Sequence, residues 1–433
     1  MAAIDSSNEW TKHVGRRPIA RKRSLARHGF HILVASLFLY YWTPGALPPS
    51  ISLPKIIGFA LALYVYLKLL YPLSTRSHGL LRRLLFVVVP IMIFLLFEFL
   101  SNFQSMKESP TELAVRGLGA LIWASLPVFF IEKYRDIEAV SKRYLFTLLL
   151  VHAGIVANGL GLVSFDFGTQ GQQKVFAEFS DLSAFRSAGF MVNFGEVAII
   201  TAFGLPLAAQ GFLSSHTRRH AKLILLVLFM ASAAGAAISL SRNVWLSTAI
   251  AFLVYFCSGA FGFRKTPDGA LRAILFVGLV ILGSGLFGTI VDDLFSAAQS
   301  VRSESIDDRL SQYQAAVSEI QKNPILGPGP GYKYNNVEVH NIYLNSFVHA
   351  GLGGLFLCLL LLYILLKLLL RVVRGETRYR AILGGYMGML TSISFYPVLL
   401  SSAPVFWLTL GICFAAATTP EFKSRACGSV NVN

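Results

Sequence analysis

Three residues with side chains suited to phosphate or proton chemistry stand at the ends of long apolar segments: Arg186, Arg242 and His340. A guanidinium is always charged and can hold a phosphate through two parallel hydrogen bonds. A histidine titrates near neutral pH and can accept a proton from a hydroxyl group. Each residue also has a plainer explanation, since Arg186 could contact lipid phosphate, Arg242 could extend to the membrane interface, and His340 could cap a helix.

The elements that must position these residues follow from an apolar composition. Of 433 residues, 55% are hydrophobic and only 14% are charged, and the mean hydropathy is +0.60. Because a soluble domain of this size needs a charged surface, much of the chain must face lipid. The net charge of +16 lies mostly in short connectors, which indicates membrane topology and no nucleic-acid partner. The four cysteines form neither a disulfide framework nor a zinc spacing, so we expect no metal and no cofactor.

Twelve apolar runs are long enough to cross a membrane as helices, which predicts an all-α polytopic membrane protein. The first 29 residues are polar and basic without a clear cleavage site, so the first run is interpreted as an uncleaved anchor. That run is short, and the last two are separated only by Leu400-Ser401. The runs lie at 30–46, 54–72, 84–102, 112–131, 143–163, 188–212, 222–240, 243–262, 270–290, 345–370, 380–400 and 402–419.

The positive residues predict the orientation of these spans. With both termini in the cytoplasm, 28 of the 38 Lys and Arg residues fall on the cytoplasmic side, as the positive-inside rule requires. We see neither an internal repeat nor a separate soluble domain. The predicted organisation is a cytoplasmic tail at 1–29, nine spans within 30–290 that include an outer loop at 164–189, a large outer loop at 291–344, three spans within 345–419, and a cytoplasmic tail at 420–433.

The large outer loop has predicted internal structure. Ser305 is expected to cap an amphipathic helix. Its apolar stripe recurs at helical spacing and consists of Ile306, Leu310, Tyr313, Val317 and Ile320. Asn323-Pro324 should end that helix. The Gly-Pro run at 327–331 is expected to form a rigid turn, although its backbone amides could line an anion site. His340 to Leu344 then enter the tenth span.

Ionisable residues within the predicted spans gather in the outer half. We expect Glu98 and Arg116 to neutralise each other and His349 to be structural. A transporter needs a polar path through both halves of the membrane, so this one-sided distribution favours a reaction chamber open to the outside. The residues concerned are Glu98, Arg116, Glu196 and His349, with His152 near mid-depth.

Three short motifs can be compared with those of a known family. They are Asn323-Pro324 to Gly331 followed by His340-Asn341-Ile342-Tyr343-Leu344 and Gly351-Leu352-Gly353; Ser241-Arg242-Asn243-Val244-Trp245; and Arg186 to Phe190 with Asn193. Together with the large outer loop before a late span, these motifs resemble the O-antigen ligase and polysaccharide polymerase superfamily of bacterial envelopes. The resemblance extends over roughly residues 185–370.

The resemblance implies a metal-independent, membrane-embedded glycosyltransferase of GT-C-like architecture in the bacterial inner membrane, with its active face in the periplasm. Its donor would be a glycan on undecaprenyl diphosphate, and its acceptor a glycan or lipid A-core. Polysaccharide export or assembly proteins are candidate partners besides the membrane lipids. His340 would be the catalytic base, and the donor diphosphate would be bound by Arg186, Arg242, Arg309 and Arg302. The possible supporting residues are Asn341, Tyr343, Gly329, Gly331, Glu196, Glu98 and Arg116.

Several functions remain open at this point. A polymerase of exopolysaccharide or O-antigen and an O-antigen ligase share these motifs. The loop at 291–344 contains seven acidic residues against four basic ones, a net charge of −3, which disfavours a phosphorylated lipid A-core acceptor and so favours the polymerase. A flippase for polysaccharide precursors would need polar residues through the inner half. A structural partner in a biosynthetic complex would tolerate replacement of Arg186, Arg242 and His340.

Overall fold

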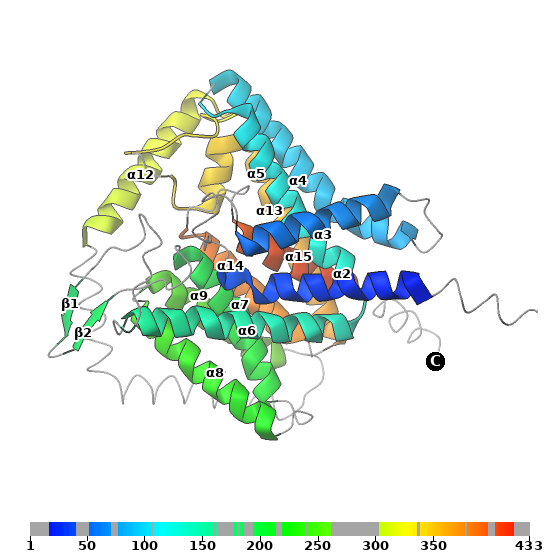
Figure 1. Ribbon diagram of the computed structural model, residues 1–433. Helices are drawn as coiled ribbons and strands as arrows, with labels where there is room; N and C mark the ends of the chain where they lie inside the picture. Colours follow the sequence, from blue (N-terminus) through cyan, green and yellow to red (C-terminus); the bar gives the residue numbers. More distant parts are fainter. Residues whose placement is uncertain are drawn as a thin grey trace, which may run out of the picture.

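A helical bundle makes up most of the computed structural model (Figure 1). The structure describes residues 17–39, 52–70, 77–105, 107–159, 162, 176–179, 182–185, 194–213, 219–239, 241–260, 303–335, 338–376, 379–396 and 403–419. The predicted span at 270–290 therefore lies outside the described residues, as do Arg186, Asn193 and Arg302.

Most of the described helices overlap the predicted apolar runs. They are α2 (Arg17–Ala35), the short 3-10 helix η1 (Leu37–Leu39), α3 (Leu53–Leu70), α4 (Ser77–Ser105), α5 (Pro110–Phe130), α6 (Tyr134–Gly159), α7 (Phe194–Leu213), α8 (Arg219–Ile238), α9 (Arg242–Ala260), α12 (Ser303–Lys322), α13 (Ile342–Gly375), α14 (Arg380–Ile393) and α15 (Pro404–Thr418).

The structure adds two features that the sequence did not predict. The loop at 164–189 carries a short antiparallel hairpin of β1 (Phe176–Phe179) and β2 (Leu182–Phe185), while the other described elements are helical. The first helix begins at Arg17, within the segment predicted as a polar tail. Its arginines, lysine, alanines and leucine favour helix irrespective of hydropathy, which a search for apolar runs does not detect.

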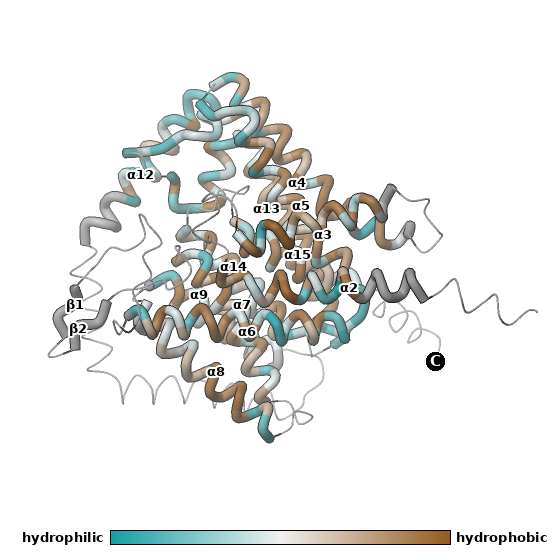
Figure 2. Tube along the Cα trace, viewed as in Figure 1, coloured by the Kyte–Doolittle hydropathy of each residue, from teal (hydrophilic) through white to brown (hydrophobic). Residues whose placement is uncertain are grey.

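Six of the described helices are long and apolar enough to cross a membrane, namely α4, α5, α6, α7, α8 and α13. The apolar helices α3 and α15 are shorter, and α14 has 14 residues. Figure 2 shows apolar residues along α4, α13 and α15 and polar residues along α12. The chain is therefore polytopic, while the number of twelve spans remains a prediction.

The helices form a buried centre and an apolar periphery. α14 packs against α9 and α7, α15 packs against α5, and α13 packs against α4. In α7 72% of the apolar segment is buried, against 24% in α8. The large hydrophobic residues of α8 that are exposed to the surroundings are Leu223, Ile224, Leu226, Val227 and Met230. An exposed apolar surface of this kind is suited to contact with lipid.

At one end of the bundle, the first residues of α7 and α9 and the residue before α13 are hydrogen-bonded to the end of α14. Asn243, in the first turn of α9, donates from Nδ2 to the carbonyl oxygen of Ser392 at 3.2 Å. The Ser392 hydroxyl donates to the carbonyl oxygen of Gly195 in α7 at 3.2 Å. Asn341, which precedes α13, donates from Nδ2 to the carbonyl oxygen of Ser394 at 3.1 Å. The residues around positions 195, 242 and 340 thus lie at the same end.

The opposite end of the bundle is held by basic residues. Arg83 of α4 donates to the Thr418 hydroxyl and to the carbonyl oxygen of Ile131, both at 3.0 Å. Arg27 of α2 pairs with Asp136 at the start of α6 at 3.2 Å. A separation between this basic end and the end that carries the candidate residues is the arrangement that the alternating topology predicts.

Helix α12 lies outside the stacked bundle (Figure 1). The sequence predicted this helix and its end before Asn323 correctly, but it begins at Ser303, two residues before the expected cap at Ser305. It is attached through a small separate apolar cluster in which Ala316 and Ile320 of α12 meet Val339 and Val348. This cluster holds α12 against the segment that enters α13.

Candidate functional site

His340 is fixed in place by two consecutive residues of α12. Its backbone N–H donates to Gln312 Oε1 at 3.1 Å, and its ring Nδ1 lies 3.3 Å from the same oxygen. Gln312 is 4% exposed, and its Nε2 donates to the carbonyl oxygen of Glu338 at 2.6 Å. The Tyr313 hydroxyl donates to the carbonyl oxygen of His340 at 2.8 Å. The position of His340 therefore depends on a helix that lies outside the bundle.

The surroundings of His340 keep its ring neutral. Burial lowers its pKa to about 4, the positive charge of Arg309 contributes in the same direction, and a backbone hydrogen bond involving Glu338 acts against them. Arg309 is one turn before Tyr313 on α12, so the structure places one predicted phosphate ligand within electrostatic reach of the predicted base. A histidine that is neutral at pH 7 is ready to accept a proton.

The residues after His340 build the start of α13. Asn341 is its N-cap, since its Oδ1 accepts the backbone N–H of Tyr343 at 2.9 Å and that of Leu344 at 3.0 Å. The Tyr343 side chain hydrogen-bonds Ser394. Asn341 and Tyr343 thus tie the start of α13 to the end of α14, which is a positioning role.

Arg242 is the first residue of α9 and is partly buried. The turn before it is braced by Trp245, whose ring N–H donates to the carbonyl oxygen of Ala236 at 2.7 Å. Together with the Asn243 contact to α14, this turn places Arg242 at the same end of the bundle as His340. The motif at Ser241-Arg242 and the motif at His340-Asn341 are thus connected through α14. Arg186 and Arg302 lie outside the described residues.

The electrostatic field at this end suits an anion. α7, α9 and α13 all begin here, and the N-terminus of a helix carries a partial positive charge. Glu196, in the first turn of α7, is 1% exposed. The aromatic ring of Tyr396 packs against Gly195 and lies within electrostatic reach of Glu196 and Glu338. Glu196 therefore belongs to the interior of this end and not to its surface.

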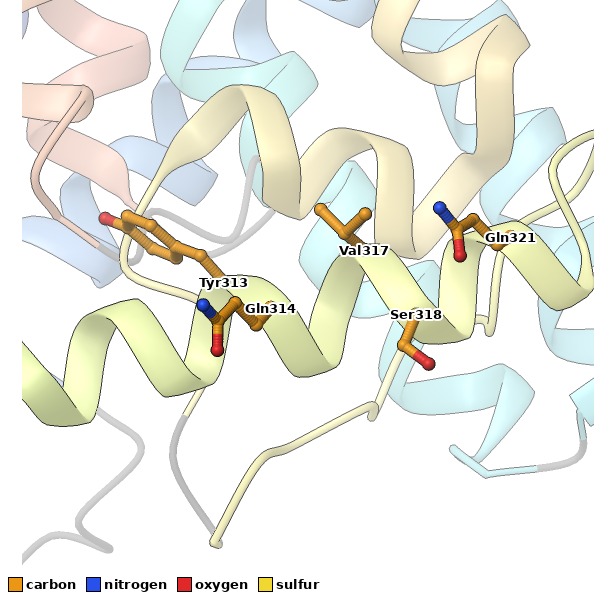
Figure 3. Close-up of a pocket in the computed structure, with 5 residues that line it drawn as sticks. All are labelled: Tyr313, Gln314, Val317, Ser318 and Gln321. Carbon is orange, nitrogen blue, oxygen red and sulfur yellow. The ribbon is translucent and has the colours of Figure 1, made fainter.

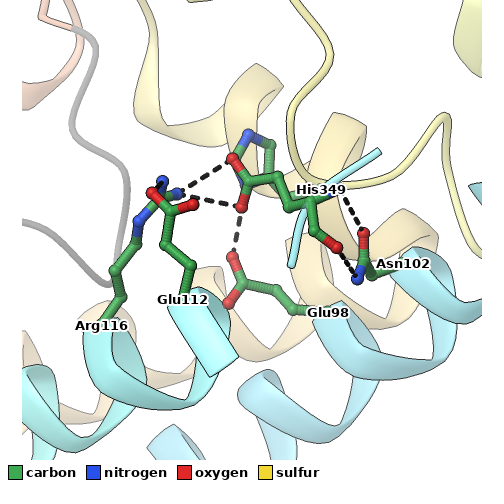
Figure 4. Close-up of polar contacts among 6 residues, drawn as sticks. Glu98, Asn102, Glu112, Arg116 and His349 are labelled. Carbon is green, nitrogen blue, oxygen red and sulfur yellow. Dashed lines mark hydrogen bonds and ion pairs between the residues drawn. The ribbon is translucent and has the colours of Figure 1, made fainter. Parts of the chain in front are cut away.

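A second polar cluster joins the end of α4, the start of α5 and α13 (Figure 4). His349 Nδ1 lies 3.3 Å from Glu98 Oε1, and the two side chains are 4% and 1% exposed. Arg116 donates to both carboxylate oxygens of Glu108 at 3.0 Å and also pairs with Glu112. The expectation that Glu98 and Arg116 would neutralise each other is therefore wrong.

The reason for the different pairing is the turn between α4 and α5. Asn102 donates to the carbonyl oxygen of Glu108 at 2.8 Å and accepts the Glu108 backbone N–H at 3.0 Å. These two bonds fix the backbone of Glu108 in the turn, and its carboxylate reaches Arg116 on the following helix. Glu98 is left beneath the turn, where His349 of α13 reaches it.

The Gly-Pro run is fastened into a kink of α13. The helix is interrupted at Ala350 and at Gly351, whose φ is 64°. The backbone N–H of Gly329 donates to the carbonyl oxygen of Val348 at 3.0 Å, and that of Leu352 donates to the carbonyl oxygen of Pro324 at 3.1 Å. The Gly329 amide is thereby used within the protein and is not available to an anion, which agrees with the rigid turn expected from sequence.

The glycine conformation is required here. Gly327, Gly329 and Gly331 have φ of 73°, 97° and 83°, a region that L side chains rarely adopt. A Cβ on Gly327 would lie 2.5 Å from two backbone oxygens of α13, and one on Gly331 would lie 2.8 Å from Glu108. Gly327 therefore allows the turn to lie against α13, and Gly329 and Gly331 allow it to lie against the end of α4 and the α4–α5 turn.

A shallow, open groove of about 310 Å³ lies along α12, and all of its lining residues belong to that helix (Figure 3). It is lined by Tyr313 at one end, by Gln321 at the other, and by Gln314, Val317 and Ser318 between them. No lining residue carries a charge. Tyr313 also contacts His340, so the groove begins beside the candidate base. Among the described residues, no three His, Cys, Asp or Glu side chains are grouped so as to hold a metal ion.

Sequence reasoning missed the residues that hold the candidate base. Gln312 lies 28 residues before His340, and a single glutamine on a predicted amphipathic helix gives no signal of its partner. Tyr313 belongs to the predicted apolar stripe of that helix, but its hydroxyl also donates a hydrogen bond to the carbonyl oxygen of His340. Ser392 and Ser394 belong to the end of a short helix whose contacts no local pattern predicts.

Comparison with known proteins finds one family. Residues 225–359 match a family model described as O-antigen ligase. The match extends from within α8 through α9 and α12 into the first half of α13, and thus contains Arg242, Arg309 and His340. A search among curated proteins finds no match.

Proposed function

We propose that this protein is a polymerase of a bacterial surface polysaccharide, a proposal supported by the match of residues 225–359 to the O-antigen ligase family. It joins oligosaccharide repeats carried on undecaprenyl diphosphate, in the inner membrane and at the periplasmic face. Both termini lie in the cytoplasm in this proposal. The observation that carries it is the geometry around His340, a neutral, positioned base within electrostatic reach of Arg309 at the start of α13.

In the proposed reaction a base accepts a proton from the acceptor, and cations stabilise the leaving group. A hydroxyl oxygen of the acceptor glycan attacks the anomeric carbon of the donor, and its proton passes to His340. The bond from that carbon to the diphosphate oxygen breaks, and the electron pair leaves with undecaprenyl diphosphate. Arg242 and Arg309 stabilise the charge that develops on the leaving group. Arg186 and Arg302 complete the diphosphate site in this proposal.

The donor itself would strengthen the base. Arg309 lowers the pKa of His340 in the structure, because a nearby positive charge disfavours a second one. An anionic diphosphate bound to Arg309 would offset that charge. The proton affinity of His340 would then rise when the donor is in place, which is when the acceptor hydroxyl must lose its proton.

The groove on α12 supports a glycan acceptor. Its lining combines the Tyr313 ring with the side-chain amides of Gln314 and Gln321 and the hydroxyl of Ser318. Aromatic rings and neutral hydrogen-bonding groups suit sugar rings, whereas the phosphates of lipid A-core would call for cations. Together with the net charge of −3 on the loop at 291–344, this neutral groove favours the polymerase over the ligase.

The products in a deletion strain test the proposal. A polymerase defect leaves single repeats on the lipid carrier and removes long polymer. A ligase defect leaves full-length polymer on the carrier and bare lipid A-core, and a flippase defect traps unreacted repeats on the cytoplasmic side. Complementation with His340→Ala, at membrane levels equal to those of the wild type, should reproduce the deletion phenotype. Normal polymer in that strain would overturn the catalytic assignment.

A further inference from the structure

The side-chain amide of Gln312 can be oriented from its two backbone partners. The backbone N–H of His340 can only donate, so the Gln312 atom 3.1 Å from it must be the amide oxygen. The carbonyl oxygen of Glu338 can only accept, so the atom 2.6 Å from it must be the amide nitrogen. The two bonds demand the same orientation of the amide, which settles an assignment that is ambiguous for an isolated glutamine.

The orientation of Gln312 determines where the imidazole proton sits. His340 Nδ1 lies 3.3 Å from the same amide oxygen, and an amide oxygen can only accept. A hydrogen bond there requires the proton on Nδ1. A neutral imidazole has one ring proton, so Nε2 then carries a lone pair and no hydrogen.

From this geometry we infer that Gln312 is a positioning residue that holds His340 in the Nδ1–H tautomer and leaves Nε2 as the proton acceptor. This inference rests on the proposed function, because it gives the base its reactive atom. In the reaction the acceptor hydroxyl transfers its proton to Nε2, and the imidazolium keeps the Nδ1–H bond to Gln312. A fixed tautomer matters because the opposite one presents an N–H where the reaction needs a lone pair.

The choice of an amide over a carboxylate has a chemical consequence. A carboxylate beside Nδ1 would favour the charged imidazolium and raise the pKa of His340. The charged group that acts on the ring is Arg309 of α12, and Glu338 acts on it through a backbone hydrogen bond. The neutral Gln312 can therefore orient the ring while leaving it unprotonated at pH 7.

Nitrogen NMR tests the tautomer without reference to activity. The full-length protein, labelled with ¹⁵N in histidine, is reconstituted in liposomes, and the His340 signals are assigned by their loss in His340→Ala. We expect a protonated Nδ1 and a bare Nε2 in the wild type, and a mixture of tautomers in Gln312→Leu. A bare Nδ1 in the wild type, or an unchanged tautomer in Gln312→Leu, would overturn the inference.

Kinetics test the consequence for catalysis. Gln312→Leu should lower kcat by roughly 10- to 100-fold, and Gln312→Glu should move the acid limb of the pH–rate profile to higher pH. The matched control is Ser311→Ala, which changes an exposed residue of the same helix that does not line the groove and should leave the limb in place. If the limb does not move in Gln312→Glu, Gln312 is only structural.

The two sets of data separate this inference from the proposed function. If NMR finds the Nδ1–H tautomer but His340→Ala retains full activity, the catalytic assignment fails and the tautomer stands. If His340→Ala is inactive but the wild-type ring carries its proton on Nε2, the catalytic assignment stands and the role of Gln312 fails.

Discussion

Two histidines nine residues apart on the chain are held in opposite ways. His340 lies in the loop before α13, and its ring faces the amide of Gln312 from a helix outside the bundle. His349 lies inside α13, and its ring faces the carboxylate of Glu98 from α4, with both side chains almost fully buried. The neutral amide of Gln312 orients the His340 ring without adding a charge beside it, whereas the contact between His349 and Glu98 ties α13 to α4 inside the bundle.

The largest expected effect is a difference in the rate of glycan transfer between variants of the two histidines. His340→Ala removes the proton acceptor and should lower the rate of glycan transfer by about 10³-fold, within the range for loss of a general base. His349→Ala should leave transfer within a few-fold of the wild type in protein that remains folded. Transfer from purified lipid-linked donor in proteoliposomes measures both rates. Equal losses of transfer rate in the two variants would contradict the different roles assigned to His340 and His349.

The arginines near the two histidines should also differ, with Arg309 affecting the rate of transfer and Arg116 affecting stability. Arg309 acts on His340, so Arg309→Ala should lower the rate by roughly 10- to 100-fold through weaker charge stabilisation, and Arg309→Lys should recover part of it. Arg116 is already paired with Glu108 and Glu112. Arg116→Ala should therefore lower the thermal midpoint in detergent while kcat of the folded protein stays unchanged. A large kcat effect in Arg116→Ala would move that residue into the site.

The contrast between these clusters shows what sequence could and could not provide. Local patterns were sufficient for the six described helices that are long and apolar enough to span a membrane, for α12 and for the rigid Gly-Pro turn, because hydropathy, helical spacing and glycine act over neighbouring residues. They also singled out His340 and Arg242 by residue type and place. The partners could not be predicted in this way, since Gln312 with His340 and Glu98 with His349 depend on how distant helices pack. Arg116 illustrates the failure, because Asn102 fixes the turn that brings Glu108 to it.

The pH dependence of activity should report the environment of His340. Activity requires a neutral His340, and its pKa is lowered to about 4. The acid limb of kcat/KM should therefore remain flat as pH falls from 7 to about 5 and decline as pH passes through about 4. An unshifted histidine would already lose tenfold one pH unit below 6.5. Initial rates in buffered proteoliposomes locate the limb, and a midpoint near 6.5 would contradict the role of burial and of Arg309.

Arg309→Ala should move that limb toward 6.5, because the cation that disfavours protonation is removed. The stability contribution has a defined sign as well. The unfolded chain binds the His340 proton below about 6.5 and the folded chain only below about 4, so this contribution is present above pH 6.5 and is lost as pH falls toward 4. Unfolding midpoints of the wild type and His340→Ala between pH 7 and 5 should therefore converge as the pH is lowered.

The smallest effect should come from the buried pair and should appear in stability alone. Glu98→Gln and His349→Gln each remove one partner of a pair that is 3.3 Å apart, and each leaves the other polar group buried. The double variant removes both, so the losses should not add, and a coupling of about 0.5–3 kcal/mol is expected for neighbours of this kind. Unfolding of the four proteins in detergent measures the coupling. Additive losses would mean that Glu98 and His349 lie together without interacting, and a fall in kcat without loss of stability would place the pair in the reaction instead of beside it.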